Sequence, residues 1–123
     1  MCRNGGRRIL MLPGRSALPA MIHDEIRTIL SAPTVGDDAP TLPSVEDTLT
    51  AGYARALTLE AEHRRLQRRL ADSAAALADD DSPRRVKELR RLAQKLKAVD
   101  AELVELRALL GSLFERAALL RAA

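Results

Sequence analysis

The chain has 123 residues, which is enough for one domain at most, and it holds no Trp, one Tyr and one Phe. So few aromatic side chains argue against an α/β or all-β core, and the packing must rest on aliphatic residues. Hydrophobic residues make up 46% of the chain and charged residues 30%, a balance typical of long helices with one buried stripe. The net charge of +3 is too small to require a nucleic-acid partner by itself.

We expect no signal peptide or membrane span near the N-terminal end, although the basic, acid-free start also suits an organellar presequence. An apolar run at 9–12 stops at Pro13 and Gly14, which makes it too short for a signal-peptide core or a membrane span. Cys2 is the single cysteine, so no intramolecular disulfide can form and a reducing compartment is favoured. The expectation is a cytoplasmic protein without a transmembrane segment, and we interpret it as bacterial.

The first part of the chain predicts one short helix between two irregular segments. Glycine and proline recur in residues 1–20, which we expect to form a disordered leader. Isoleucines at helical spacing predict a short amphipathic helix at 21–30, and prolines predict an extended linker at 31–43. The sequence leaves three candidate start codons open, Met1, Met11 and Met21.

Two long helices are predicted after the linker, at 44–78 and 83–121. We expect Ser44 to cap the first of them by accepting a hydrogen bond from the amide three residues on. Each helix carries small or apolar residues at alternating steps of four and three, the pattern of a coiled-coil seam. The seam positions are Val45, Leu49, Gly52, Ala56, Leu59, His63, Leu66, Leu70, Ser73 and Leu77 in the first helix, and Leu89, Leu92, Leu96, Val99, Leu103, Leu106, Leu110, Leu113, Ala117 and Leu120 in the second.

A turn is predicted at 79–82, because three aspartates precede Ser82 and a proline that is well placed as a first helical residue. If the chain folds back about Asp81, residues equally far from Asp81 face each other, and nine pairs of seam positions meet, from Val45 with Ala117 to Ser73 with Leu89. Gly52 then faces Leu110. The predicted fold is all-α, an antiparallel two-helix coiled-coil hairpin of residues 44–121 with a short N-terminal amphipathic helix and a flexible leader.

Apolar residues outside the seam predict a surface that another element must cover. They are Tyr53, Leu57, Leu109, Phe114 and Leu119. Leaving such a cluster in water would forgo several kcal/mol at about 25 cal/mol per Å² of apolar surface. The cover is the 21–30 helix, a second copy of the chain, or a helix of a foreign protein.

Positive charge gathers in the part of both long helices next to the turn. The basic patch consists of Arg64, Arg65, Arg68, Arg69, Arg84, Arg85, Arg90 and Arg91, with Lys87, Lys95 and Lys97 beside it. A stiff basic pair of helices can lie along a phosphate backbone, so a nucleic-acid partner is one interpretation. The other is that arginine simply solvates the outer faces of the helices.

No catalytic group, cofactor site or metal site is predicted. His63 lies in the seam opposite Val99 and is expected to be a partly buried core histidine, since no second His or Cys is near enough to share a metal. The tip Asp79-Asp80-Asp81 resembles, in topology alone, the carboxylate-bearing tips of Gre-type transcription factors. That resemblance implies a coiled coil inserted into RNA polymerase to position magnesium.

We therefore expect a non-enzymatic coiled-coil interaction or scaffold protein. The end of the hairpin away from the turn, with its apolar surface, would mediate assembly with a protein partner or as a homodimer. The half next to the turn, with the basic patch, would bind an acidic partner. A nucleic-acid-associated hairpin and an RNA polymerase accessory with an acidic tip are the alternatives.

Overall fold

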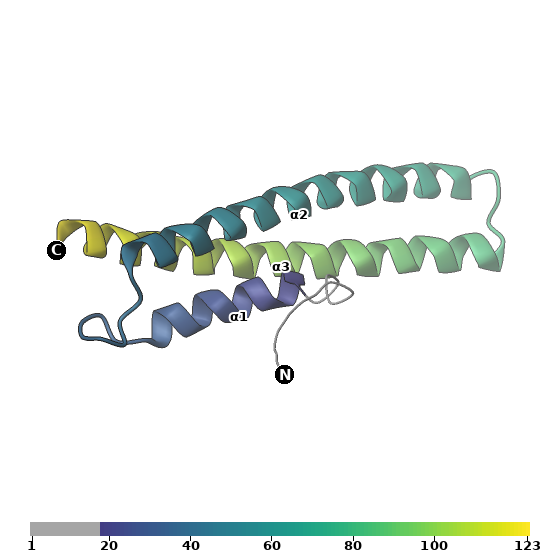
Figure 1. Ribbon diagram of the computed structural model, residues 1–123. Helices are drawn as coiled ribbons and strands as arrows, with labels where there is room; N and C mark the ends of the chain where they lie inside the picture. Colours follow the sequence, from purple (N-terminus) through teal and green to yellow (C-terminus); the bar gives the residue numbers. More distant parts are fainter. Residues whose placement is uncertain (1–17) are drawn as a thin grey trace, which may run out of the picture. The chain divides into compact units, whose positions relative to one another are not determined.

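The computed structural model describes residues 18–123, and the leader expected at 1–20 lies outside them except for its last three residues. The described chain forms three α-helices and no strand: α1 (Leu18–Ser31), α2 (Leu42–Leu77) and α3 (Pro83–Ala122) (Figure 1). The prediction of an all-α protein is confirmed. α1 begins three residues before the expected start at Met21 and therefore includes the end of the expected leader.

The chain divides into two compact units. The three-helix unit takes the chain up to Gly52 together with Leu109–Ala123, and the two-helix unit is Tyr53–Ala108. α1 belongs to the first unit alone, whereas α2 and α3 contribute residues to both.

α2 starts at a different residue from the one predicted, and the predicted cap is wrong. Thr41, and not Ser44, caps the helix: the amide of Ser44 donates to Thr41 Oγ1 at 3.3 Å, and the amide of Val45 donates to the Thr41 carbonyl at 3.0 Å. Pro43 lies inside the first turn. A proline is tolerated there because the first amides of a helix have no partner within it.

The start of α3 matches its local sequence. The amide of Arg85 donates to Ser82 Oγ at 3.3 Å, and Pro83 is the first helical residue. Asp80 Oδ1 accepts from the amide of Ser82 at 3.0 Å, so one carboxylate fixes the residue that caps the helix. α2 ends at Leu77 and α3 begins at Pro83, which leaves five residues for the turn.

In the two-helix unit α2 and α3 run antiparallel and side by side (Figure 1). Arg55 Nη2 donates to Glu102 Oε2 at 2.9 Å, and Arg107 pairs with Glu60, so ion pairs join the helices. The seam between them is buried at Leu59, Leu66, Leu92, Leu103 and Leu106. Toward the turn, Leu70, Leu77, Leu89 and Leu96 are only half-buried, because no third helix covers this part of the seam.

In the three-helix unit α1 packs on the other two helices. Its Ile22, Ile26 and Ile29 are buried, and Ile26 has no exposed surface. A Cβ built on Gly52 would lie 3.6 Å from Ile26 Cδ1 and 2.5 Å from Leu110 Cδ2, so side chains of α1 and α3 both converge on this glycine of α2. The predicted pairing of Gly52 with Leu110 is confirmed.

An arginine of α3 holds the C-terminal end of α1. Arg116 donates from Nη1 to the carbonyl of Ile29 and from Nη2 to the carbonyl of Leu30, both at 3.1 Å. The last carbonyls of a helix have no partner within it and carry the negative end of its dipole. A charged donor therefore satisfies two of them, which contributes about 1.5–3 kcal/mol for each hydrogen bond to a charged group.

Two glycines in the long helices predict opposite responses to the same substitution. A Cβ at Gly111 would meet nothing within 4 Å, so Gly111→Ala should raise the free energy of unfolding by about 0.5–1 kcal/mol through helix propensity. Gly52→Ala gains the same propensity but displaces the buried Leu110, at a cost of about 1–3 kcal/mol. We expect it to be the less stable variant in urea unfolding followed by circular dichroism. Equal gains in both variants would contradict the close approach at Gly52.

Candidate functional site

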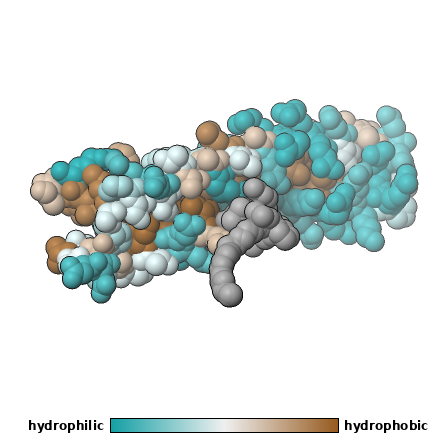
Figure 2. Space-filling view, viewed as in Figure 1, coloured by the Kyte–Doolittle hydropathy of each residue, from teal (hydrophilic) through white to brown (hydrophobic). Residues whose placement is uncertain are grey.

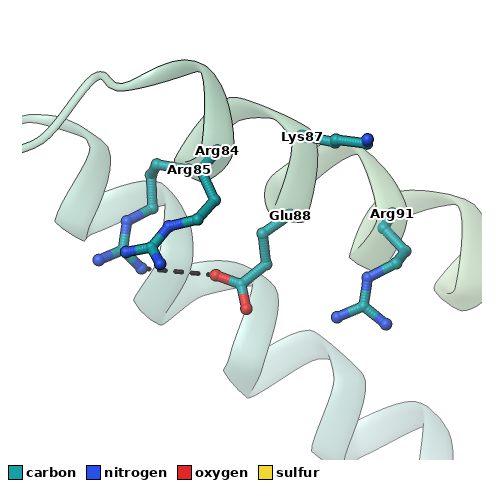
Figure 3. Close-up of a pocket in the computed structure, with 5 residues that line it drawn as sticks. All are labelled: Arg84, Arg85, Lys87, Glu88 and Arg91. Atoms are coloured by element: carbon teal, nitrogen blue, oxygen red, sulfur yellow. Dashed lines mark ion pairs between the residues drawn. The ribbon is translucent and has the colours of Figure 1, made fainter.

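The first turns of α3 present cations around a hollow in the two-helix unit. The hollow has a volume of about 510 Å³. It is lined by Arg84, Arg85, Lys87, Glu88 and Arg91 (Figure 3). Four of these five side chains are basic, and the carboxylate of Glu88 lies 3.5 Å from Arg85 Nη1.

A second hollow adjoins the first and crosses from α3 to α2. It has a volume of about 240 Å³ and shares Arg85 and Glu88 with the first. Its other lining residues are Arg69, Asp72, Ser73 and Leu92. Ser73 is buried at a seam position, and its hydroxyl has no hydrogen-bond partner within the described protein. The hollow thus brings together one basic residue of each helix, Arg69 and Arg85.

The predicted basic patch is on the surface. Arg85 is half-buried, and the remaining seven residues of the patch are exposed. The two hollows unite four of the eight, Arg69, Arg84, Arg85 and Arg91. The other four, which line neither hollow, are Arg64, Arg65, Arg68 and Arg90. On the face shown in Figure 2, the part of the two-helix unit next to the turn is mostly hydrophilic.

Most cations at 64–97 have no carboxylate partner. Arg85 is the exception, with Glu88 at 3.5 Å and Asp80 at 3.9 Å. Within the described residues no ion pair is made by Arg64, Arg65, Arg68, Arg69, Arg84, Lys87, Arg90, Arg91, Lys95 or Lys97.

The three-helix unit uses its cations differently. Arg27 lies 3.3 Å from Asp24, Arg121 lies 2.9 Å from Glu46, and Arg116 binds the carbonyls at the end of α1. The described residues of this unit include three Lys and Arg against seven Asp and Glu, whereas Tyr53–Ala108 has thirteen against ten. Among the described residues, the cations without a carboxylate partner are therefore concentrated in the two-helix unit.

At the turn, the three tip aspartates differ in their surroundings. Asp79 and Asp81 are exposed, and Asp80 is half-buried. Hydrogen bonds from the amide and the side chain of Ser82 hold the pKa of Asp80 below its ordinary value, with a smaller effect of Arg85. Among the described residues no group of three or more His, Cys, Asp or Glu is arranged to hold a metal ion. Asp80 thus has a structural role at this turn.

His63 has a partner that the seam pattern does not identify. Its Nε2 lies 3.5 Å from Asp100 Oδ1, and its side chain is 24% exposed. Val99, the residue expected opposite, is half-buried. Asp100 follows Val99 along the chain, so the partner lies at the edge of the seam, next to the predicted one.

The residues predicted as an assembly surface are divided between the two units. In the two-helix unit Tyr53 is 46% and Leu57 66% exposed. In the three-helix unit Phe114 is 53% and Leu119 66% exposed, and Leu109 is half-buried. α1 buries its own isoleucines without covering Phe114 or Leu119, so apolar surface stays exposed on this unit.

Sequence reasoning missed Arg116 and Ser73. The interaction of Arg116 with α1 joins residues far apart in the chain, and nothing in its neighbourhood signals it. Ser73 did carry a signal, because a hydroxyl interrupts a stripe of leucines. Such an interruption removes volume from the seam, and here it leaves a hollow beside Arg69.

None of the helices described has an apolar stretch long enough to cross a lipid bilayer. Comparison of the chain with protein-family models, with curated proteins and with solved structures gives no match. The function must therefore be inferred from the surface of the chain itself.

The lowered pKa of Asp80 predicts a specific acid sensitivity. A carboxylate whose pKa is lower in the folded state stabilises that state at pH values above its pKa in the unfolded chain, near 3.8. This contribution is lost as the pH falls through the pKa of the folded state. Asp80→Asn keeps an acceptor for the Ser82 amide and removes the titration. Its melting temperature should therefore fall less than that of the wild type between neutral pH and pH values below about 3.8. Asp81→Asn, at the same turn, is the control and should follow the wild type; identical curves for Asp80→Asn would exclude this role.

Proposed function

We propose that the chain is a non-enzymatic interaction protein, in which a two-helix coiled-coil hairpin presents a basic surface to an acidic partner. The hairpin acts as a stiff docking arm, because its arginines are carried on paired helices and not on loops. The second part of the proposal is that apolar residues of the three-helix unit mediate assembly.

The observation that carries the proposal is the contrast in how the two units use their cations. Ten basic side chains of the two-helix unit lie on its outer faces with no carboxylate partner in the described chain. Like charges held this close repel one another and raise the free energy of the folded state. An anionic partner would relieve that repulsion and release condensed counterions.

Removing the positive charges of the basic surface should abolish binding to a polyanion without unfolding the helices. We expect the wild-type chain to bind dextran sulfate at low ionic strength and to lose affinity as salt rises. Alanine at all five of Arg64, Arg65, Arg68, Arg90 and Arg91 should remove this binding, because all five side chains are exposed. Fluorescence anisotropy of the labelled polymer measures binding, and circular dichroism measures helicity.

Two single substitutions provide a control matched in charge. Arg68→Ala removes an unpaired cation of the two-helix unit, whereas Arg121→Ala removes a cation of the three-helix unit that is paired with Glu46. The first should weaken binding several-fold and the second should leave it nearly unchanged. If both act alike, or if the wild type binds no polyanion, arginine only solvates the helices and the proposal is wrong.

For assembly, the occupant that we propose is a second copy of the chain. The exposed Phe114 and Leu119 lie on a unit whose described residues include more carboxylates than cations, an excess that complements the chain's own basic surface. A second copy supplies both an apolar contact, at the exposed Tyr53 and Leu57 of its two-helix unit, and the opposite charge of the same unit.

Self-association should therefore depend on Phe114. Phe114→Ser is expected to shift the chain toward monomer in sedimentation equilibrium, by about tenfold in the dissociation constant for each 1.4 kcal/mol lost. Val35→Ser is the control, since Val35 is 81% exposed in the linker between α1 and α2. A wild-type chain that stays monomeric at every concentration would refute assembly by self-association.

A further inference from the structure

We infer that the acidic partner of the basic surface is the phosphodiester backbone of a double-stranded nucleic acid. This inference rests on the proposed function, because it specifies the partner of that same surface. Three features of the basic residues at 64–97 carry it: the lack of exposed apolar anchors among them, the spacing of the cations, and the lack of aromatic residues in this segment.

The basic surface has no apolar centre. The large hydrophobic residues exposed in the two-helix unit are Tyr53, Leu57 and Val104, and all three lie outside 64–97. Protein interfaces place buried aromatic or aliphatic anchors at their centre and leave charges at the rim. Interfaces with nucleic acid draw most of their hydrogen bonds from charged and polar side chains on phosphates. A surface of cations alone therefore fits phosphates better than it fits an acidic protein.

The cations recur along the helices at short intervals. On α3, Arg84, Lys87 and Arg91 follow at rises of about 4.5 and 6 Å, at 1.5 Å per residue. On α2, Arg65 and Arg69 are one turn apart, again about 6 Å. Arg69 of α2 and Arg85 of α3 line the same hollow, so cations of both helices lie beside one another there. A nucleic-acid strand carries a phosphate on every nucleotide, so successive phosphates can contact successive cations along the helices. Each guanidinium group can donate two hydrogen bonds to the oxygens of one phosphate.

The absence of aromatic residues at 64–97 favours a duplex over a single strand. Proteins that hold single strands stack the bases on aromatic side chains, each worth about 1–3 kcal/mol. In a duplex the bases are already stacked, so contacts to the backbone suffice. Such binding has no direct readout of sequence.

The acids near the basic surface limit where a duplex can lie. Glu88 and Asp80 both face Arg85, and Asp72 lines the smaller hollow. The exposed Asp79 and Asp81 put negative charge at the turn. A duplex should therefore lie along the sides of the helices and not across the tip of the turn. Replacing Asp79 and Asp81 with Asn should strengthen binding.

The test is a titration of the full chain with a labelled duplex of mixed sequence at several salt concentrations. A plot of log affinity against log salt has a slope of about −0.9 for each phosphate neutralised. The triple variant Arg84→Gln, Lys87→Gln, Arg91→Gln should make this slope shallower by about 0.9 for each lost contact, nearly 3 in all. Arg121→Gln, in the three-helix unit, should leave the slope unchanged.

Polyglutamate and a single-stranded homopolymer are the competing probes. Tighter binding to the duplex than to either, with the shallower slope in the triple variant, supports the inference. Binding to polyglutamate but not to the duplex overturns it and leaves the proposed function standing, whereas binding to neither overturns both. Tighter binding to the single strand, or an equal loss in Arg121→Gln, also refutes it.

Discussion

The packing of α2 against α3 along a seam of aliphatic residues is the constraint on which each unit depends. With one Tyr and one Phe in the chain, apolar burial comes mainly from leucine, alanine, valine and isoleucine at helical spacing. The depth of that burial differs between the units. Where α1 adds a third helix, Val45, Leu113 and Ala117 have no exposed surface, whereas Leu70 and Leu96 of the two-helix unit are half-buried. Next to the turn part of the seam is thus left exposed, so the hydrophobic contribution that opposes the repulsion among the cations is smaller there.

Arginines join helices in both units, and only the two-helix unit also carries a set of unpaired arginines among the described residues. In the three-helix unit Arg116 satisfies the last carbonyls of α1, so its charge is used to hold one helix on another. In the two-helix unit Arg55 and Arg107 join α2 to α3 through Glu102 and Glu60. Nearer the turn cations outnumber carboxylates, and apart from Arg85 the arginines there make no ion pair with a described residue. The unpaired positive charge is therefore on the part of the two-helix unit next to the turn.

Whether an interaction can be predicted from the sequence depends on how far apart its residues lie along the chain. The seam, the Gly52–Leu110 pairing and the cap at Ser82 were predictable, since a repeat and a turn define them locally. The start of α2 was not, because Pro43 looks like a helix breaker when it is in fact a residue of the first turn. Arg116 was unpredictable for another reason: its acceptors on α1 lie more than eighty residues away. For the candidate site, the basic residues were identified, but the hollows that group only some of them depend on side-chain packing.

Ser73 links the seam to the basic surface. A leucine at this position would continue the stripe and fill the space that Arg69, Arg85 and Leu92 now line. The antiparallel register sets which residues meet there, and a shift of α3 by one turn would move Arg85 about 5.4 Å along α2, away from Arg69. Cations from two helices would then no longer share one hollow. The arrangement of these cations is thus a consequence of how the leucines pair, so the seam determines the surface on which the proposed function depends as well as the fold.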